Sequence, residues 1–374
     1  MRLTVIALAL AAGSFGAYQH LAAQAGTAGR EPFKLGTFER GGRAFLGLVL
    51  RDTQVADLRQ ANAAYEGRNS SAKKTTIPTD MKDLIVRYES ELKERLYAIA
   101  ADLAAARTAA AYVYPVADVK TLAPVRPAVI LNAGGNYEEH TDGIAQQQAR
   151  GGRAATSAPV AVSVPGIWER KPGDPRRENP YLFLKSPTTV TGPFDPILMP
   201  TGRSQIDFEC EFDIVVGKKA NHVAVDRAAD YIFGYTIQID VSDRGGRGDR
   251  KMGGSDWLVG KNHDTFAPLG PFIVPKEFMK DPLNTKQTFT LNGEVMQDSN
   301  TNRMTHNIYE LLAYGSSNIT LNPGDMISGG SPAGTNIERA EPRWMRAGDT
   351  AVCTIEGLGT QKHSVVAASV QSSQ

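Results

Sequence analysis

The sequence predicts an α+β fold in which β-strands predominate. Three observations indicate this: one long helical pattern lies in the N-terminal third, many short strand-like runs follow residue 126, and 36 Gly with 21 Pro among 374 residues are typical of frequent turns. At about 150 residues per domain, the length accommodates two or three domains. Because 41 basic and 40 acidic residues nearly cancel, we expect no nucleic-acid partner.

The first 25 residues (1–25) have the pattern of a secretory signal peptide. Arg2 precedes an apolar stretch at 3–12, and Ala23-Gln24-Ala25 supplies the small residues of a cleavage site. A membrane-spanning helix needs about 20 apolar residues, so we expect no stable membrane span after cleavage. The sequence therefore predicts a secreted or periplasmic protein that is cleaved near Ala25.

Residues 26–125 are expected to form a small α/β N-terminal domain. A strand-like run at 43–50 is followed by what we interpret as the only long helical pattern of the chain, over 81–103. Asp80 and Asp83 lie in its first turn, where acidic side chains complement the helix dipole. The apolar residues recur at spacings of three and four: Met81, Leu84, Tyr88, Leu92, Leu96, Ile99 and Leu103.

Residues 126–362 are expected to form a larger, mostly β-stranded domain, followed by a flexible tail at 363–374. Asn292-Gly293 indicates a β-hairpin. A Gln-, Gly- and Pro-rich stretch at 143–180 predicts a long loop or insertion. Strands are predicted at 128–131, 181–184, 206–216, 231–241 and 289–296.

The segment 206–214 alternates strictly between apolar and acidic residues, so as a strand it places four carboxylates on one face. Neighbouring carboxylates on a strand face lie about 7 Å apart and repel one another unless cations neutralise them. One interpretation is a solvated outer face that pairs with lysines of another strand. The other is a cation site. Cys210 falls on the apolar face, and the sequence leaves open whether it pairs with Cys353.

A second strand favours the cation site. Asp240 ends the polar face of the strand predicted at 231–241, just before a Gly- and Arg-rich loop. Together with Glu209 and Glu211 it would complete an all-oxygen ligand set that suits a hard cation such as Mg²⁺, Mn²⁺ or Ca²⁺. No pair of histidines at zinc-binding spacing competes with this set.

These residues resemble the motifs of the fumarylacetoacetate hydrolase family. Glu209-x-Glu211 resembles the family's E-x-E pair, and 240–244 resembles its D-V-S-x-R segment. Asn136-Tyr137-x-x-His140 is similar to the N-Y-x-x-H motif. Five further segments match in the family's order, namely 181–187, 260–271, 292–297, 321–325 and 330–334.

The resemblance implies a mixed β-sandwich roll that carries a divalent metal, usually Mg²⁺, and that commonly forms a homodimer. It implies a metal-dependent catalytic domain that acts on a small keto acid. Carried over by position, the residue roles are as follows: metal ligands Glu209, Glu211 and Asp240; water activation by His140; oxyanion stabilisation by Lys261; and substrate binding by Tyr137, Arg244, Arg247 and Ser331.

The pattern is broken after His140. Many small family members have a glutamate three positions later, and here that residue is Gly143. Asp142 is the nearest acidic candidate for a catalytic partner, and a distant carboxylate is the other possibility. The loop after Arg244 also departs from the family pattern, because Gly245 and Arg247 replace its Asp-Gln.

Three functions remain open at this point. The first is a hydrolase that acts on a carbon–carbon bond in a 2,4-diketo acid or acylpyruvate-like substrate, with a metal-polarised carbonyl and a His-activated water. The second is a decarboxylase, isomerase or hydratase that acts on a 2-keto acid, for which Gly143 is the argument. The third is a non-catalytic, exported protein that binds a keto acid and a metal.

Overall fold

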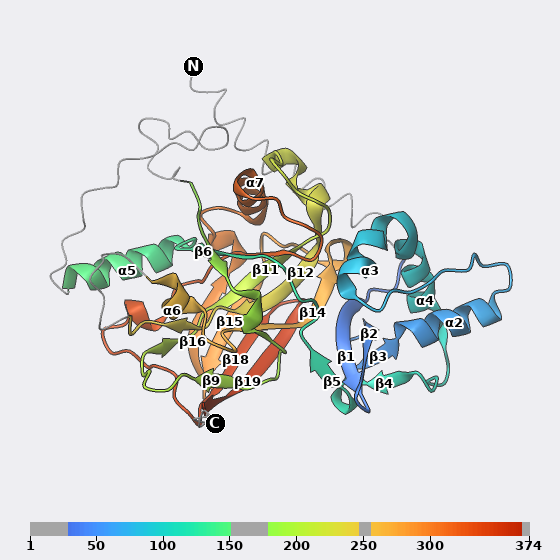
Figure 1. Cartoon of the computed structure of the whole chain (residues 1–374), viewed down its shortest axis with the longest axis horizontal. Coiled ribbons are helices and arrows are strands. Elements are labelled where there is room, and N and C mark those ends of the chain that lie inside the picture. Colours follow the sequence, from blue (N-terminus) through green and yellow to red (C-terminus); the bar gives the residue numbers. More distant parts are fainter. Residues whose placement is uncertain (1–28, 151–178, 247–255, 369–374) are drawn as a thin grey trace, which may run out of the picture.

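The computed structural model describes residues 29–150, 179–246 and 256–368. It shows a mixed α+β molecule dominated by sheet, which confirms the predicted fold class. Figure 1 shows the helices of the N-terminal region gathered at one end and the strands of the remaining chain stacked at the other. Among the described residues, no helix is both long enough and apolar enough to cross a bilayer.

The N-terminal region combines short strands with three helices. Its strands are β1 (Lys34–Arg40), β2 (Arg43–Leu50), β3 (Gln54–Asp57), β4 (Val113–Pro115) and β5 (Lys120–Leu122). Its helices are α2 (Leu58–Arg68), α3 (Met81–Arg87) and α4 (Lys93–Ala105). The predicted helix is thus confirmed, with Asp80 as its N-cap, but a π-helical turn at Tyr88–Leu92 joins α3 to α4.

A large central sheet continues these strands through the molecule. β1 pairs with β14, so the boundary expected near residue 125 separates strands of one sheet, and the domain division stays a prediction. The path runs β4-β3-β2-β1-β14-β12-β11-β17-β6-β7, with β5 on β1 and β8 on β14. The strands of this sheet beyond the N-terminal region are β6 (Ile130–Gly134), β7 (Tyr181–Lys185), β8 (Val190–Thr191), β11 (Cys210–Val216), β12 (Ile232–Ile239), β14 (Ala267–Pro275) and β17 (Met326–Ser328).

A second sheet, ordered β16-β15-β18-β19-β9, packs on one face of the central sheet. Asn292 and Gly293 adopt positive φ angles of 53° and 85° at the turn between β15 and β16, which confirms the predicted hairpin. The strands of this sheet are β9 (Ile197–Met199), β15 (Lys286–Leu291), β16 (Glu294–Asn300), β18 (Thr350–Ile355) and β19 (Gly359–Ala367). A separate pair consists of β10 (Ile206–Asp207) and β13 (Ser242–Asp243).

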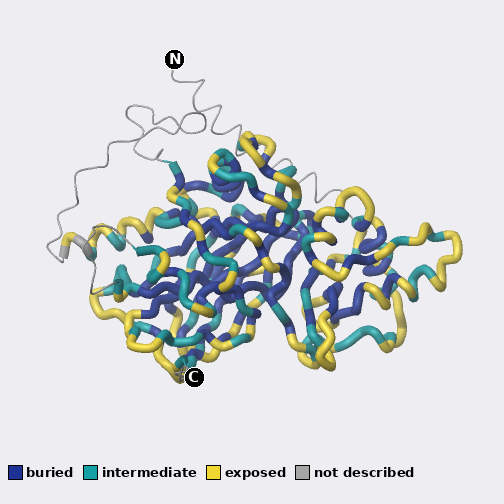
Figure 2. The backbone as a smooth tube through the Cα atoms, viewed as in Figure 1, coloured by how far each residue is buried: buried dark blue, intermediate teal, exposed yellow. Residues whose placement is uncertain are grey.

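Alternate residues of the central strands fill two cores on opposite faces of the sheet. Ile214 of β11 belongs to the core between the two sheets, where Phe208 and Phe289 stack with ring centroids 4.3 Å apart. Its neighbour Val215 belongs to the core beneath α2–α4. Figure 2 shows this buried centre as a continuous dark band. The central sheet is therefore covered on both faces, and any polar group on it must find a partner.

The described residues after 125 form three further helices: α5 (Glu138–Arg150), α6 (Trp257–Lys261) and α7 (Ile308–Asn318). The expectation of a single long helical pattern is therefore wrong, since α2 and α7 each have 11 residues. The loop predicted from residue 143 begins as helix, because α5 continues to Arg150. The 3₁₀ turns are η2 (Val116–Asp118), η3 (Pro187–Thr189), η4 (Val225–Tyr231), η5 (Lys276–Phe278), η6 (Thr301–Arg303) and η7 (Asn336–Glu338).

Candidate active site

The acidic segment 206–214 lies inside the molecule, but it is not the single strand that we predicted, since β10 ends at Asp207 and β11 begins at Cys210. Phe208, Cys210 and Phe212 point into the core between the sheets, as the alternation predicts. The carboxylates on the opposite face are also buried, with Glu209 4% and Glu211 1% exposed. The interpretation as a solvated outer face is therefore wrong, because these carboxylates are shielded from water and need partners inside the protein.

Glu209, Glu211 and Asp240 converge at one point of the central sheet. Each offers one carboxylate oxygen, and these three oxygens lie within 4.8 Å of one another. Asp240 directly follows β12, and its backbone N–H donates to the Glu209 carbonyl over 2.8 Å, which fixes the end of one strand against the start of the other. An all-oxygen set of this kind suits a hard divalent cation.

Three cationic side chains surround this group. Lys261, at the end of α6, donates from Nζ to Glu209 Oε2 over 2.7 Å and to Asp240 Oδ2 over 2.5 Å. Lys185 of β7 is fully buried and donates to Asp240 Oδ1 and to the Val241 carbonyl. Arg244 bridges Glu209 and Asp207. The acidic group is thus tightly enclosed by positive charge.

The buried carboxylates and the cationic side chains around them form an acidic layer in which negative charge is in excess. Among the described residues, five buried carboxylates face three cations, which leaves an excess of two negative charges when all are ionised; burial raises the pKa of Glu211 and of Asp213, which opposes that full ionisation until a further positive charge is present. The carboxylates are Asp207, Glu209, Glu211, Asp213 and Asp240, and the cations are Lys185, Arg244 and Lys261. One divalent ion carries the charge that would neutralise this excess, so the residues present fit such an ion.

The two glutamates of the set differ in their pKa. Burial and the nearby charges of Asp240 and Glu209 raise the pKa of Glu211 well above its ordinary value. Burial would also raise the pKa of Glu209, but Lys261 and Arg244 outweigh it and lower that pKa. Glu211 is held by Asn132 Nδ2 over 2.9 Å and by the Ser328 hydroxyl. Of these two glutamates, Glu211 is therefore the one whose ionised form most needs a further positive charge.

His140 is paired with a carboxylate from far along the chain. It lies in the first turn of α5 and is 4% exposed, and its Nδ1 contacts Glu338 Oε1. Glu338 also accepts from the Thr335 hydroxyl over 2.6 Å and from the Gly334 N–H over 3.0 Å. Although burial would raise the pKa of Glu338, these hydrogen bonds lower it, so the group is ionised and His140 donates from Nδ1.

Glu338 fills the space left by the missing family glutamate. A Cβ atom added to Gly143 would lie 2.9 Å from Glu338 Cγ and 3.0 Å from Glu338 Oε2. Asp142, our candidate for this partner, is exposed, and no described contact joins it to His140. The structure thus supplies the partner as a distant carboxylate, and Glu338 replaces Asp142 in the proposed site.

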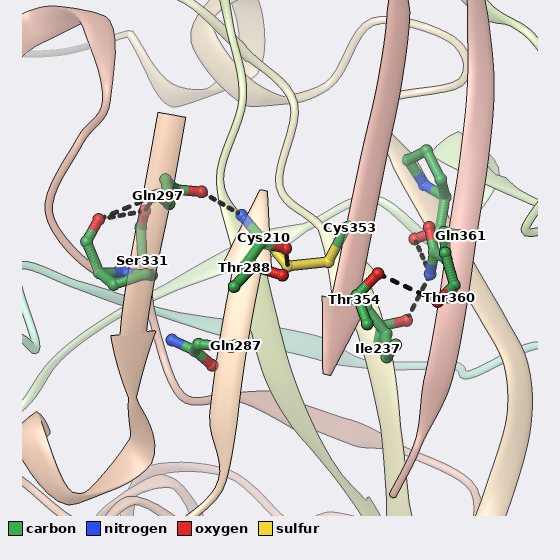
Figure 3. Close-up of a disulfide and its surroundings, with 12 residues drawn as sticks. Cys210, Ile237, Gln287, Thr288, Gln297, Ser331, Cys353, Thr354, Thr360 and Gln361 are labelled. Carbon is green, nitrogen blue, oxygen red and sulfur yellow. Dashed lines mark hydrogen bonds between the residues drawn. A yellow bond between two sulfur atoms is a disulfide. The ribbon is translucent and has the colours of Figure 1, made fainter. Parts of the chain in front are cut away.

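The substrate-binding candidates are placed differently. Tyr137 is fully buried, and its hydroxyl accepts from Gln287 Nε2 over 2.7 Å. Ser331 accepts from Gln297 Nε2 over 3.0 Å and donates to the Pro332 carbonyl over 3.0 Å; the same Gln297 accepts from the Cys210 N–H (Figure 3). Both hydroxyls thus have protein partners.

Of the two loop arginines that we expected to bind substrate, Arg244 and Arg247, the structure describes only Arg244. Arg244 contacts carboxylates of the acidic layer, whereas Arg247 lies outside the described residues. Cys210 and Cys353 form a disulfide with their Cα atoms 5.6 Å apart, which answers the question that the sequence left open (Figure 3).

Sequence reasoning missed Lys185 and Glu338. Lys185 shares a strand face with Phe183, and a lysine that ends an apolar strand was the available signal. Thr335-x-x-Glu338 has the spacing of a capping box, which the structure contains, but that pattern predicts only a turn. Nothing in the local sequence connects Glu338 with a histidine 198 positions away.

Comparisons with known proteins find similar sequences over most of the chain. Residues 130–366 match the model described as "Fumarylacetoacetate (FAA) hydrolase C-terminal". A mitochondrial oxaloacetate tautomerase of Rattus norvegicus is 35% identical over 292 residues, which cover 78% of this chain and 80% of the relative. A mitochondrial oxaloacetate tautomerase of Homo sapiens is 32% identical, with coverages of 80% and 83%.

Solved structures show the same architecture. A 5-carboxymethyl-2-hydroxymuconate delta-isomerase from Mycobacterium smegmatis has a TM-score of 0.59 at 28% identity, and covers 90% of this chain and 99% of its own. A maleylpyruvate hydrolase from Sphingobium sp. SYK-6, crystallised with manganese(II) and pyruvate, has a TM-score of 0.62 at 27% identity, with the same coverages.

The predicted location is corrected by these relatives. Their names place the similar tautomerases in mitochondria, which contradicts a secreted or periplasmic location. The segment 1–25, on which that prediction depended, lies outside the described residues.

Proposed function

Because the chain belongs to the fumarylacetoacetate hydrolase family, we propose that it is a metal-dependent tautomerase that interconverts the keto and enol forms of a small 2-keto dicarboxylic acid such as oxaloacetate. The observation that carries the proposal is the convergence of three buried carboxylates with Lys261, in a chain whose His140 has an ionised partner. Relatives at 32–35% identity that bear the name oxaloacetate tautomerase support this choice of reaction.

The acidic set would hold the ion. Glu209, Glu211 and Asp240 are its proposed ligands, with Mg²⁺ as the expected ion and Mn²⁺ or Ca²⁺ as alternatives. A bound divalent ion supplies Lewis-acid polarisation of a carbonyl that neighbours a carboxylate. The manganese(II) and pyruvate named for the maleylpyruvate hydrolase structure support an ion and a keto acid of this class.

His140 is the proposed base. With its Nδ1 proton directed at Glu338, the imidazole keeps its Nε2 lone pair free to take a proton from the carbon next to the ketone. The C–H electron pair then forms the carbon–carbon double bond, and the carbonyl electrons move to oxygen. Return of the proton to that oxygen gives the enol, and the reverse sequence restores the ketone.

Lys261 is proposed to balance the negative charge that develops on oxygen. Burial would lower its pKa, but Asp240 and Glu209 outweigh this and raise it, so the ammonium group is charged. A fixed positive charge in a site enclosed from water stabilises an enolate without reorganisation. Its ring contact with Phe183, 5.0 Å from Nζ to the centroid, limits its movement.

Carbon–carbon bond hydrolysis is the second candidate, because one observation favours it. Glu338 restores a carboxylate beside His140, which is an arrangement suited to activating water. The substrate would then be an acylpyruvate-like 2,4-diketo acid. The non-catalytic alternative was motivated by Gly143 and by the altered loop after Arg244, and the contact between Glu338 and His140 speaks against the first of these two grounds. A homodimer stays a prediction from the family.

One experiment separates these functions. The metal-stripped protein is supplied with Mg²⁺ or Mn²⁺, and the loss of enol absorbance of oxaloacetate is followed beside pyruvate release from an acylpyruvate. We expect metal-dependent tautomerisation that His140→Gln abolishes. Pyruvate release without tautomerisation would favour the hydrolase, and the absence of both would contradict the proposed site chemistry.

A further inference from the structure

We propose that Asp207 and Asn336 are positioning residues, which hold the turn that carries Glu338 against His140 and join that turn to the strand of the candidate metal ligands. The inference rests on the proposed function, since it concerns the same acid–base pair. It assigns a role to Asp207, the acidic residue that ends β10, precedes Glu209 and lies outside the three-carboxylate group.

Asp207 is a fully buried carboxylate that contacts none of the candidate ligands; it accepts from Asn336 of the turn, from Arg244, and from the neighbouring Phe208 N–H over 3.0 Å. Its oxygens accept from the Asn336 backbone N–H over 3.1 and 3.2 Å and from Asn336 Nδ2 over 2.8 Å. Arg244 Nε donates to it over 3.1 Å. A buried charge satisfied in this way is costly to disturb, because removing a partner leaves the rest uncompensated.

Asn336 transmits this anchor to Glu338. It is 1% exposed and begins η7, the 3₁₀ turn that ends at Glu338. Its Oδ1 accepts from the Arg343 N–H over 2.5 Å, so the side chain joins Asp207, at the end of β10, to the chain after the turn. Thr335 caps the same turn. Glu338, two residues later, is therefore placed by contacts made at Asn336.

Arg244 links the anchor to the ligand strand. Its guanidinium donates to Asp207 through Nε and to Glu209 through Nη2. One arginine thus lies between the carboxylate that holds the turn and a proposed ligand. This arrangement keeps the acid–base pair in register with the metal set, and small misplacement of reacting groups is expensive in rate.

The first test uses no substrate. In protein labelled with ¹⁵N-histidine, the His140 signal is assigned with His140→Gln, and we expect the wild-type imidazole to carry its proton on Nδ1. Asn336→Ala should weaken this tautomer preference, because the turn that carries Glu338 loses the side-chain contact that anchors it to Asp207. It should leave affinity for Mn²⁺ alone unchanged, since no candidate ligand is touched. Asn318→Ala, an exposed asparagine of α7, is the matched control.

The second test is a double-mutant cycle in turnover. Asn336→Ala should lower kcat by about 10–100-fold in the wild-type background. In the Glu338→Gln background the same substitution should have little effect, because its target has already been removed. A merely structural role would give equal losses in both backgrounds.

These experiments distinguish failure of the positioning role from failure of the proposed tautomerase function. Retention of the Nδ1 tautomer in Asn336→Ala, or loss of Mn²⁺ affinity in that variant, overturns the positioning role even if the protein is an active tautomerase. A changed tautomer in a protein without turnover supports the positioning role and overturns the proposed function. Should Asn336→Ala fail to fold, Asp207→Asn, which preserves shape and removes the charge, is read by the tautomer signal alone, because Asp207 also contributes charge to the acidic layer.

Discussion

At the scale of single residues, the site depends on buried charges that compensate one another. Lys185 illustrates this, because burial lowers its pKa while its contact with Asp240 opposes the change. A buried lysine of this kind keeps its positive charge only where carboxylates surround it. The acidic layer, the lysines and Arg244 thus form one electrostatic unit.

Glu338→Gln tests the acid–base pair directly. The amide cannot compensate an imidazolium and can donate toward His140, which disfavours the Nδ1 tautomer. We expect kcat to fall by about 10²–10⁴-fold with little change in substrate affinity, as measured by steady-state kinetics. The control is Glu356→Gln, an exposed glutamate in the turn after β18. Unchanged kcat in Glu338→Gln would remove this pair from the mechanism.

The metal-ligand candidates were predictable from the sequence, whereas the partner of His140 was not. Alternation along one strand is local, so Glu209 and Glu211 could be placed on one face without a structure. The glycine at position 143 indicated only that the usual glutamate partner of His140 is missing. Glu338 takes the place of that glutamate because the fold brings a distant turn close to His140, and no local sequence spacing predicts a contact over 198 positions.

At the scale of elements, ion pairs connect the helices of the N-terminal region. Glu66 of α2 accepts from Arg95 of α4 over 2.8 Å and from the Thr75 N–H over 2.7 Å. The hydrogen bond from Arg95 contributes most to lowering the pKa of Glu66, from 4.5 to about 2. The carboxylate therefore stabilises the fold only where it is ionised.

This lowered pKa fixes the sign of a pH effect. Because the folded pKa of Glu66 lies below the unfolded one, its contribution is complete above pH 4.5 and is lost as the pH falls to about 2. The difference in unfolding free energy between wild type and Glu66→Gln, measured with urea, should shrink across that window. A difference that stays constant down to pH 2 would show that the pair contributes no linkage.

Two glycines provide a matched test of backbone conformation. Gly293 has φ +85° in the β15–β16 turn, so Gly293→Ala should destabilise the protein by about 1–2 kcal/mol. Gly67 lies in α2, where an added Cβ meets nothing within 4 Å, and Gly67→Ala should stabilise by about 0.5–1 kcal/mol. Chemical denaturation measures both, and equal signs would contradict this account.

Helices and turns were predictable from the sequence where one face is apolar and the other polar, or where the turn residues are characteristic. The amphipathic pattern at 81–103 identified α3 and α4, and Asn292-Gly293 identified a hairpin. The helix α7 was not predicted. It is buried over much of its surface, including Gly315 and Ser316, and therefore lacks a polar stripe. The π-helical turn at Tyr88–Leu92 keeps the same apolar residues buried, so periodicity could not reveal it.

At the scale of the whole molecule, a disulfide joins the two sheets. Cys210 of β11 lies between two candidate ligands, and Cys353 belongs to β18 of the second sheet. Both residues are fully buried, and the bond closes a segment with a sequence separation of 143. It therefore connects the ligand strand to the layer behind it (Figure 3).

Removing this connection should lower global stability. We expect the Cys210→Ala/Cys353→Ala protein to lose about 2–5 kcal/mol of unfolding free energy, because a long loop is no longer restrained in the unfolded chain. Denaturant unfolding of oxidised wild type and of the double variant measures the difference. Equal midpoints and slopes would show that packing alone holds the sheets together.

The central claim is that three buried carboxylates hold a divalent ion that the reaction requires. The most direct measurement is a Mn²⁺ titration of metal-stripped protein, with oxaloacetate tautomerisation followed at each addition. Turnover should rise with occupancy of one site in wild type and in the exposed control Asp226→Asn. Glu211→Gln should fold, because the pKa of Glu211 is raised and the amide mimics its protonated form, yet bind no Mn²⁺ and show no turnover. Full activity without metal, or wild-type Mn²⁺ affinity in Glu211→Gln, would contradict the account.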